Sequence, residues 1–116
     1  MSRFFQSFVY AIRGFFSALK AERNMRVHLI ASLFACTTSM LLKLKSSEWI
    51  WIIASIVLVF TTELLNTAIE RLCDTVTKSQ DDNIRFVKDV SAAAVLTSAG
   101  FALVVAAIIW LPKLFA

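Results

Sequence analysis

The sequence predicts an all-α membrane protein: an amphipathic helix on the membrane surface followed by three transmembrane helices, in a single domain over residues 1–116. Three observations predict this class. Hydrophobic residues make up 59% of the chain and the mean hydropathy is +0.74, both high for a soluble protein. The chain has only two glycines and one proline, which argues against the many turns of an all-β fold. Because a bilayer offers backbone groups no hydrogen-bond partners, helices of bilayer length are the expected solution.

The first predicted element is an amphipathic helix over about residues 3–21. Its apolar residues recur at helical spacing, and its polar residues fall largely on the opposite face. The apolar set is Phe4, Phe5, Phe8, Val9, Ile12, Phe15, Phe16 and Leu19, and the polar set is Arg3, Gln6, Arg13, Ser17 and Lys20. Such a helix either lies in the membrane interface or packs on a soluble core. The apolar spans that follow favour the interface.

The three transmembrane spans are predicted over about residues 27–42, 49–70 and 90–111. The first is short for a bilayer, at about 16 residues, but Lys43 and Lys45 can extend it by reaching to the headgroups. Tryptophans mark span ends, as in an aromatic belt: Trp49, Trp51 and Trp110. In the third span a small residue recurs every fourth position: Ala94, Ser98, Ala102 and Ala106. This face lets another helix approach closely, and a bundle this thin is expected to self-associate.

The distribution of Lys and Arg predicts the orientation in the membrane. Five lie before the first span and four in the loop after the second: Arg3, Arg13, Lys20, Arg23 and Arg26, then Arg71, Lys78, Arg85 and Lys88. The N-terminus and the 71–89 loop are therefore predicted to be cytoplasmic and the C-terminus to be outside. The net charge of +4 is scattered between apolar spans, which fits anionic lipid headgroups and gives no indication of a nucleic-acid partner.

A stripe of polar residues continues out of the second span along one helix face. It consists of Glu63, Asn66, Thr67, Glu70 and Asp74, at relative positions i, i+3, i+4, i+7 and i+11. Glu63 lies about 10 Å deeper in the membrane than Glu70, at about 1.5 Å of helix rise per residue. A charged group at that depth is strongly unfavourable, so it is expected to have a function. Glu63 is therefore the strongest candidate for a functional residue.

Further polar residues lie at the cytoplasmic ends of the other two spans. They are Glu22, Arg23, Asn24, Arg26 and His28 at the first span, and Lys88 and Asp89 before the third. Two carboxylates with a nearby amide suit Mg²⁺, which takes oxygen ligands and commonly shares them with phosphate. A further carboxylate in a drier place can accept a proton from a hydroxyl group. Together these groups could form a metal-dependent catalytic site at the interface.

Each of these residues also has a simpler interpretation. Glu22 and Arg26 are spaced as an i, i+4 ion pair on a helix. Lys88 and Asp89 could be only a solvated pair with a helix N-cap. His28 is interpreted as an interfacial histidine, and no role is assigned to it.

The residues alone leave three classes of function open: an interfacial enzyme with a metal and a carboxylate base, a small proton- or cation-coupled transporter, and a structural membrane subunit. The sequence has no phosphate-binding Gly-x-x-x-x-Gly-Lys loop, no kinase-type glycine-rich loop and no Gly-x-Ser-x-Gly elbow. Cys36 and Cys73 lack the spacing of zinc ligands. A transporter needs polar groups along a path to both sides, and the outer halves of the spans carry no acid. A structural subunit does not explain Glu63.

The order of motifs resembles the prokaryotic diacylglycerol kinase family of small integral membrane lipid kinases. The residues that carry the resemblance are Glu63-Leu-Leu-Asn-Thr-Ala-Ile-Glu70, Asp74, Lys88-Asp89 and the small-residue run 91–96. It covers essentially the whole chain, from the surface helix to the third span. The segment from Glu22 to His28 is more similar to the undecaprenol kinase branch than to the diacylglycerol kinase branch.

The resemblance implies a homotrimer with active sites between subunits, in which the γ-phosphoryl group of Mg-ATP is transferred to a lipid hydroxyl. Undecaprenol is the preferred substrate on this interpretation, and diacylglycerol is the alternative. The implied roles are Glu63 as catalytic base, Asn66 as the residue that orients it, and Glu22 with Glu70 as Mg²⁺ ligands. The implied ATP contacts are Arg3, Tyr10, Glu22, Glu70, Ser79, Gln80, Asp81, Lys88 and Asp89, and the implied lipid contacts are Arg3, Glu63 and Ala92.

The chain departs from the family pattern in the loop between the second and third spans. Many members carry Glu-x-His near the nucleotide, whereas this chain has Ser79-Gln80-Asp81. Backbone contacts to a nucleotide are compatible with this change, but the side-chain contacts do not follow from the resemblance.

Overall fold

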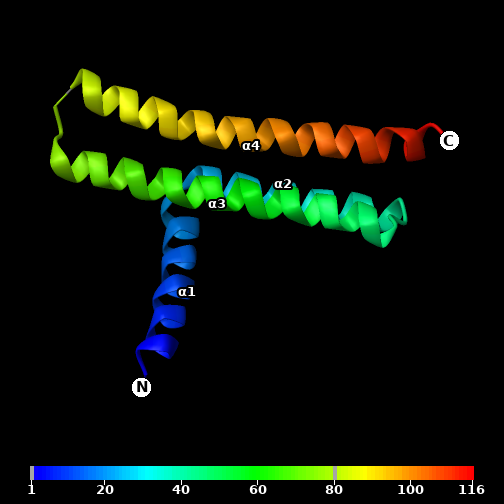
Figure 1. The fold of residues 1–116 in the computed structure, drawn as a ribbon, viewed down its shortest axis with the longest axis horizontal. Helices are drawn as coiled ribbons and strands as arrows, with labels where there is room; N and C mark the ends of the chain where they lie inside the picture. Colours follow the sequence, from blue (N-terminus) through cyan, green and yellow to red (C-terminus); the bar gives the residue numbers. More distant parts are fainter. Residues whose placement is uncertain (1, 80) are drawn as a thin grey trace.

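The computed structural model describes residues 2–79 and 81–116, and the regular secondary structure in these ranges is α-helix joined by short connections (Figure 1). Its helices are α1 (Arg3–Ala21), α2 (Arg23–Leu41), α3 (Ser46–Val76) and α4 (Asp82–Leu114). The predicted all-α fold with four helices is therefore confirmed. Gln80, one of the predicted nucleotide contacts, lies outside the described residues.

Three of the helices form a thin bundle, and the fourth, α1, projects from its side. Figure 1 shows α3 and α4 side by side and antiparallel, α2 alongside α3, and α1 running away from them toward the N-terminus. The extents of 54 × 43 × 20 Å leave room for little interior. We call the end that carries the α3–α4 connection the turn end, and the opposite end, where α2 joins α3, the far end.

Helix α1 leaves its apolar face uncovered by the rest of the chain. Ser2 caps its first turn by accepting a hydrogen bond from the Phe5 amide, and Ala18 is its one buried residue. Phe4 remains 68% exposed and Phe8 55% exposed. An amphipathic helix that packed on a soluble core would bury these rings, so the exposed face favours the membrane interface.

Helices α3 and α4 are longer than the predicted apolar spans because their polar ends continue the helix. At the N-terminus of α3, the Glu48 carboxylate accepts a hydrogen bond from the Lys45 amide at 2.9 Å. The cap of α4 is Asp81, whose Oδ1 accepts from the amides of Asn83 (2.8 Å) and Ile84 (3.2 Å). The alternative that Asp89 forms a helix N-cap is therefore wrong, since α4 begins seven residues earlier, at Asp82.

Within the described residues, α3 and α4 are the helices long and apolar enough to cross a membrane. Only 22% of the most apolar stretch of α3 and 11% of that of α4 is buried, whereas the core helix of a soluble protein would be mostly buried. Helix α2 does not meet the same standard. Its 19 residues include the polar side chains Arg23, Asn24, Arg26 and His28 in the first two turns, which lower its hydropathy. The predicted third crossing through α2 stays a prediction.

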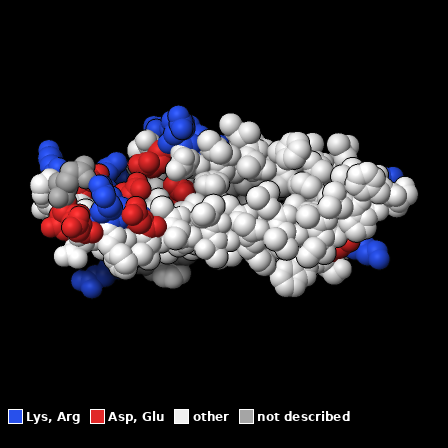
Figure 2. Space-filling model, turned by 90° about the horizontal axis from the view of Figure 1, so that it is seen from above, with Lys and Arg blue, Asp and Glu red and all other residues white. Residues whose placement is uncertain are grey.

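Charged residues gather at the turn end, and a long uncharged surface separates them from a few charges at the far end (Figure 2). The far end is closed by a small core of Leu44, Ile52, Val105 and Ile109. Beside it, Trp110 Nε1 donates to Ser39 Oγ at 3.2 Å, and Lys113 Nζ lies 3.1 Å from Glu48 Oε1. This distribution of charge is typical of a protein whose middle faces lipid.

Candidate active site

A groove of about 330 Å³ joins α2, α3 and α4 near the turn end, and it contains the central residues of the predicted site. Its polar lining is Asn24 and His28 from α2 and Glu63, Asn66 and Glu70 from α3; the rest is Val27, Ala92, Val95, Leu96 and Ala99. The structure thus brings together the predicted base, its predicted orienting amide, one predicted metal ligand and the predicted lipid contact Ala92. They converge because the polar stripe of α3 faces the other two helices.

Glu63 is among the most buried residues of the described chain, with 1% of its surface exposed. Its Oε2 atom lies 3.5 Å from Nε2 of His28, too far for a well-formed hydrogen bond, and has no hydrogen-bond partner among the described residues. Burying a charge without a hydrogen-bonded partner is strongly unfavourable. A buried carboxylate of this kind is a candidate for a functional residue.

The neighbouring polar atoms on the stripe are also buried without partners. Asn66 Oδ1 and Thr67 Oγ1 have no hydrogen bond within the described chain. Elsewhere on α3 threonine hydroxyls bond the carbonyl four residues earlier, as Thr61 does to Val57 at 2.8 Å. No hydrogen bond joins Asn66 to Glu63 in the described chain, so the predicted orienting contact is not formed here.

The donor set of the groove fits a hard divalent cation. Glu70 supplies a half-buried carboxylate, and the unpaired Asn66 Oδ1 supplies a neutral oxygen on the same face. The described residues contain no group of three or more His, Cys, Asp or Glu side chains that could hold a metal. Mg²⁺ commonly takes one or two carboxylates and completes its shell with phosphate and water. The residues therefore suit a metal that arrives with a nucleotide.

Glu22 lies at the bend where α1 ends and α2 begins. The i, i+4 ion pair with Arg26 is not formed: Arg26 Nη1 instead donates to the carbonyls of Leu19 (3.1 Å) and Lys20 (2.7 Å). Arg26 therefore closes the C-terminus of α1, which leaves the Glu22 carboxylate outside any ion pair of the described chain.

A second, polar cavity of about 270 Å³ lies at the α3–α4 turn. It is lined by Asp74, Thr77, Lys78, Ser79, Asp81, Ile84, Arg85, Lys88 and Asp89, and so contains four predicted nucleotide contacts. Lys88 Nζ donates to Asp74 Oδ1 at 2.6 Å across the turn, and this hydrogen bond raises the pKa of Lys88. Lysine and arginine beside a solvent-exposed turn can attract a phosphate.

Two predicted nucleotide contacts in this turn already have local partners. Asp81 caps α4 with its Oδ1, which gives it a structural role that the sequence analysis missed. Ser79 Oγ lies 2.7 Å from Thr77 Oγ1.

Arg3 and Tyr10 line neither cavity of their own chain. Both lie on α1, which points away from the bundle in Figure 1, and both are exposed. The Tyr10 hydroxyl donates to Gln6 Oε1 at 2.8 Å, and Arg13 lies over the Tyr10 ring.

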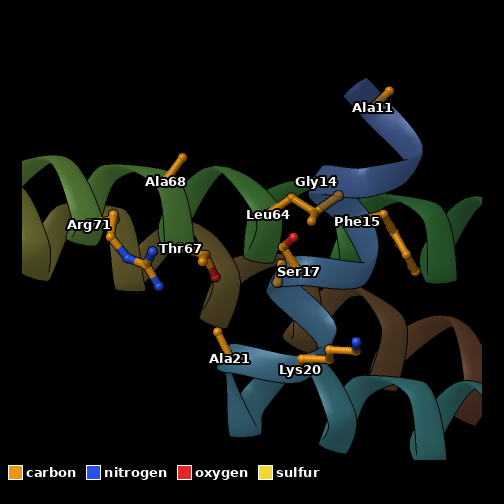
Figure 3. Close-up of a pocket in the computed structure, with 11 residues that line it drawn as sticks. Ala11, Gly14, Phe15, Ser17, Lys20, Ala21, Leu64, Thr67, Ala68 and Arg71 are labelled. Carbon is orange, nitrogen blue, oxygen red and sulfur yellow. The ribbon is translucent and has the colours of Figure 1, made fainter. Parts of the chain in front are cut away.

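The largest cavity, about 970 Å³, lies between α1 and α3 and contains none of the predicted site residues (Figure 3). Small residues of α1 form one wall, among them Ala11, Gly14 and Ser17; Leu64 and Ala68 form the other. Lys20 and Arg71 supply its positive charge. Its chemistry is that of an apolar groove, and no acid lies in it.

His28 is the residue of the groove that the sequence analysis left without a role. It stands on α2, 35 residues before Glu63, so no local spacing links the two. The available signal was depth: both were predicted to lie in the cytoplasmic half of their spans, and the antiparallel packing of α2 on α3 brings them together.

The sequence was compared with known proteins. The family model described as prokaryotic diacylglycerol kinase matches residues 9–110. The chain is 37% identical over 114 residues to the undecaprenol kinase of Bacillus subtilis, which covers 98% of this chain and 93% of that protein. It is 36% identical over 109 residues to a diacylglycerol kinase of Synechocystis sp., which covers 93% of this chain and 62% of that protein.

The family match covers most of the chain, including α3, the turn and most of α4. A buried carboxylate in a polar groove between the helices is consistent with the kinase activity of that family. The protein belongs to the prokaryotic diacylglycerol kinase family and is a lipid kinase with membrane-spanning helices.

Proposed function

We propose that this lipid kinase transfers the γ-phosphoryl group of Mg-ATP to the terminal hydroxyl of undecaprenol. The observation that carries the proposal is the Glu63 carboxylate, which is 1% exposed in a groove shared with Asn66 and Glu70. A buried base beside oxygen ligands for a metal suits the deprotonation of an alcohol next to a metal-bound phosphate.

In the proposed reaction, the hydroxyl oxygen of the lipid attacks the γ-phosphorus atom. The bond from that phosphorus to the β–γ bridging oxygen breaks, so ADP leaves and a lipid phosphate forms. Glu63 accepts the hydroxyl proton, and Asn66, one helical turn further along α3, would orient the Glu63 carboxylate. The protein mainly positions the reactants, as phosphoryl transfer requires.

Glu22 and Glu70 would hold Mg²⁺ together with the phosphates, and the metal would neutralise their charge. Lys88, Asp89 and the Ser79–Asp81 turn would bind the nucleotide at the turn end. Lys88 would exchange Asp74 for a phosphate, a stronger acceptor because of its higher charge. The nucleotide then binds from the water at the turn end of α3, and the lipid hydroxyl reaches Glu63 from the membrane.

Undecaprenol is favoured over diacylglycerol by the extent of the two similarities. The undecaprenol kinase relative matches this chain over 93% of its own length, whereas the diacylglycerol kinase relative matches over 62%. Both lipids present a primary hydroxyl group on an apolar body, and apolar helices discriminate weakly between such bodies.

The test uses the purified protein in detergent–lipid micelles with labelled ATP and Mg²⁺. Undecaprenol and diacylglycerol are supplied separately and together, and the labelled product is identified by chromatography. We expect undecaprenyl phosphate to dominate at equal lipid concentrations. Preferential labelling of diacylglycerol would reverse the assignment of the lipid, and labelling of neither would contradict the proposed reaction.

We further propose a homotrimer with composite active sites, oriented with the N-terminus and residues 71–89 in the cytoplasm and the C-terminus outside. Arg3 and Tyr10 lie away from the cavities of their own chain, which supports a role in a neighbour's site. The narrow bundle also leaves most of its apolar surface to be covered.

Composite sites predict complementation between inactive variants. Glu63→Gln and Glu22→Gln chains, mixed in one detergent population, should regain part of the wild-type activity if the two residues reach a site from different chains. Subunit exchange is checked separately by co-purification of differently tagged chains. Exchange without recovered activity would mean that one chain supplies both residues.

A further inference from the structure

We infer that His28 is a positioning residue that holds the Glu63 carboxylate from the neighbouring helix, an inference that rests on the lipid-kinase reaction proposed above. The two side chains approach from α2 and α3, with His28 Nε2 3.5 Å from Glu63 Oε2. Both are largely enclosed, since the His28 side chain is 18% exposed and that of Glu63 is 2% exposed.

No other described group holds Glu63 in place. Its Oε2 atom has no hydrogen-bond partner, and the nearby polar atoms Asn66 Oδ1 and Thr67 Oγ1 are also unpaired. A glutamate side chain has three rotatable bonds, so one anchored oxygen is needed to fix the direction of the other. His28 is the residue placed to provide that anchor.

A smaller cavity of about 210 Å³ adjoins the active-site groove and shares His28 and Ala99 with it. Its lining is mostly alanine and larger aliphatic residues. Its two serines are already engaged, since Ser32 donates to the His28 carbonyl (2.7 Å) and Ser55 to the Trp51 carbonyl (2.9 Å). On this side of Glu63 the imidazole therefore has no competing side-chain donor.

With a proton on Nε2, the imidazole can donate to Glu63 Oε2 and leave Oε1 to face the lipid hydroxyl. The present distance is longer than a good hydrogen bond, but catalytic hydrogen bonds are often long without substrate and shorten when it binds. His28 then acts through Glu63 and does not itself take the substrate proton.

The test compares His28→Gln, which keeps a donor, with His28→Phe, which keeps a flat ring and removes the donor. Ile30→Phe is the matched control, because Ile30 is 67% exposed on the same helix and belongs to no cavity of the site. Lipid phosphorylation is measured as kcat and as KM for ATP, with Mg-ATP binding and gel filtration as checks of the folded site.

We expect His28→Phe to lower kcat on the order of tenfold to a hundredfold, because a misplacement of a catalytic group by about 1 Å can cost a hundredfold in rate, with little change in KM for ATP. His28→Gln should recover most of that loss, and Ile30→Phe should match the wild type. Adding His28→Phe to Glu63→Gln should lower activity no further, because a residue that acts only through Glu63 has nothing left to position.

Normal kcat in His28→Phe would overturn the inference, as would an additive loss in the double variant. Loss of activity in His28→Gln equal to that in Glu63→Gln would identify His28 as the proton acceptor and overturn the positioning role. If His28→Phe does not fold, the comparison of His28→Gln with the wild type still decides between these roles. A wild-type protein that phosphorylates no lipid alcohol would instead overturn the proposed reaction itself, and the inference with it.

Discussion

The far end of the bundle and the buried region around Glu63 differ in whether their polar groups are paired. At the far end, Glu48 is bonded to the Lys45 amide and paired with Lys113, and buried Ser39 accepts from Trp110. Toward the turn end, Glu63, Asn66 and Thr67 each bury a polar atom without a hydrogen-bond partner in the described chain. Satisfied polar groups stabilise a fold, whereas unsatisfied ones are retained for another purpose. The comparison therefore distinguishes the structural polar contacts of the far end from the region proposed as the active site.

The largest expected effect distinguishes two glutamates of α3, Glu63 in the groove and Glu48 at the far end. Glu63→Gln should lower turnover by roughly 10²–10⁴-fold, because it removes the proposed base, and should leave Mg-ATP binding nearly intact. Glu48→Gln is the matched control and should keep turnover. Turnover by labelled phosphate transfer and nucleotide binding are measured on both. Near-normal turnover in Glu63→Gln would remove this residue from the mechanism.

The proposed metal ligands should behave differently from the proposed base. Glu70→Gln and Glu22→Gln should each weaken Mg-ATP binding as well as turnover, since a lost carboxylate leaves Mg²⁺ with fewer anionic ligands. We expect a tenfold or larger rise in the Mg²⁺ concentration needed for half-maximal activity, on the order of 1.4 kcal/mol. Raising Mg²⁺ should partly rescue both and not Glu63→Gln. The same Mg²⁺ response in all three variants would contradict the separation of roles.

Removing one hydroxyl group from each region tests the comparison through the free energy of unfolding. Ser39→Ala should lower the free energy of unfolding by about 1 kcal/mol, because it leaves the Trp110 indole N–H without its acceptor. Thr67→Val should not destabilise the protein, because its hydroxyl has no partner to lose. Both are measured by denaturation in mixed micelles. An equal loss in Thr67→Val would indicate that a neighbouring chain supplies the missing partner.

The smallest expected effect is a pH dependence at the far end. The hydrogen bond from the Lys45 amide, with the pairing to Lys113, lowers the pKa of Glu48 below its ordinary value. Its stabilising effect is therefore present above the ordinary pKa of a glutamate and is lost as the pH falls through the lowered one. Melting temperatures of the wild type and Glu48→Gln should differ at neutral pH and converge in acid. A constant difference down to the lowest pH would exclude this ionisation as the cause.

Much of the architecture could be predicted because apolar periodicity is a strong signal. The helix over residues 3–21 and the apolar middles of α3 and α4 were recognisable from spacing and hydropathy alone. The helix ends were not, since apolarity marks only the part in lipid. Asp81 caps the N-terminus of α4 nine residues before Val90, where the third span was predicted to begin, and only the hydrogen bonds of its carboxylate reveal it.

The residues of the candidate site that share one helix could be predicted from the sequence. The contacts between residues of different helices could not. Glu63, Asn66 and Glu70 share a face of α3, so helical spacing groups them. The approach of His28 to Glu63 depends on the packing of α2 on α3, and that of Lys88 to Asp74 on the geometry of the turn. Spacing along one chain segment cannot give such contacts.

Helix α3 is uninterrupted and long enough to extend from the hydrocarbon layer into water. Its 31 residues extend about 46 Å, which exceeds the roughly 30 Å of a bilayer's hydrocarbon layer. Asp74 thus stands about 16 Å above Glu63 on one rigid rod, at about 1.5 Å per residue. On the proposed mechanism, α3 fixes the distance between the nucleotide at the turn and the lipid hydroxyl at Glu63. The bilayer determines the depth at which that hydroxyl lies. Membrane thickness itself then becomes a variable of catalysis, through hydrophobic mismatch, without altering a single side chain.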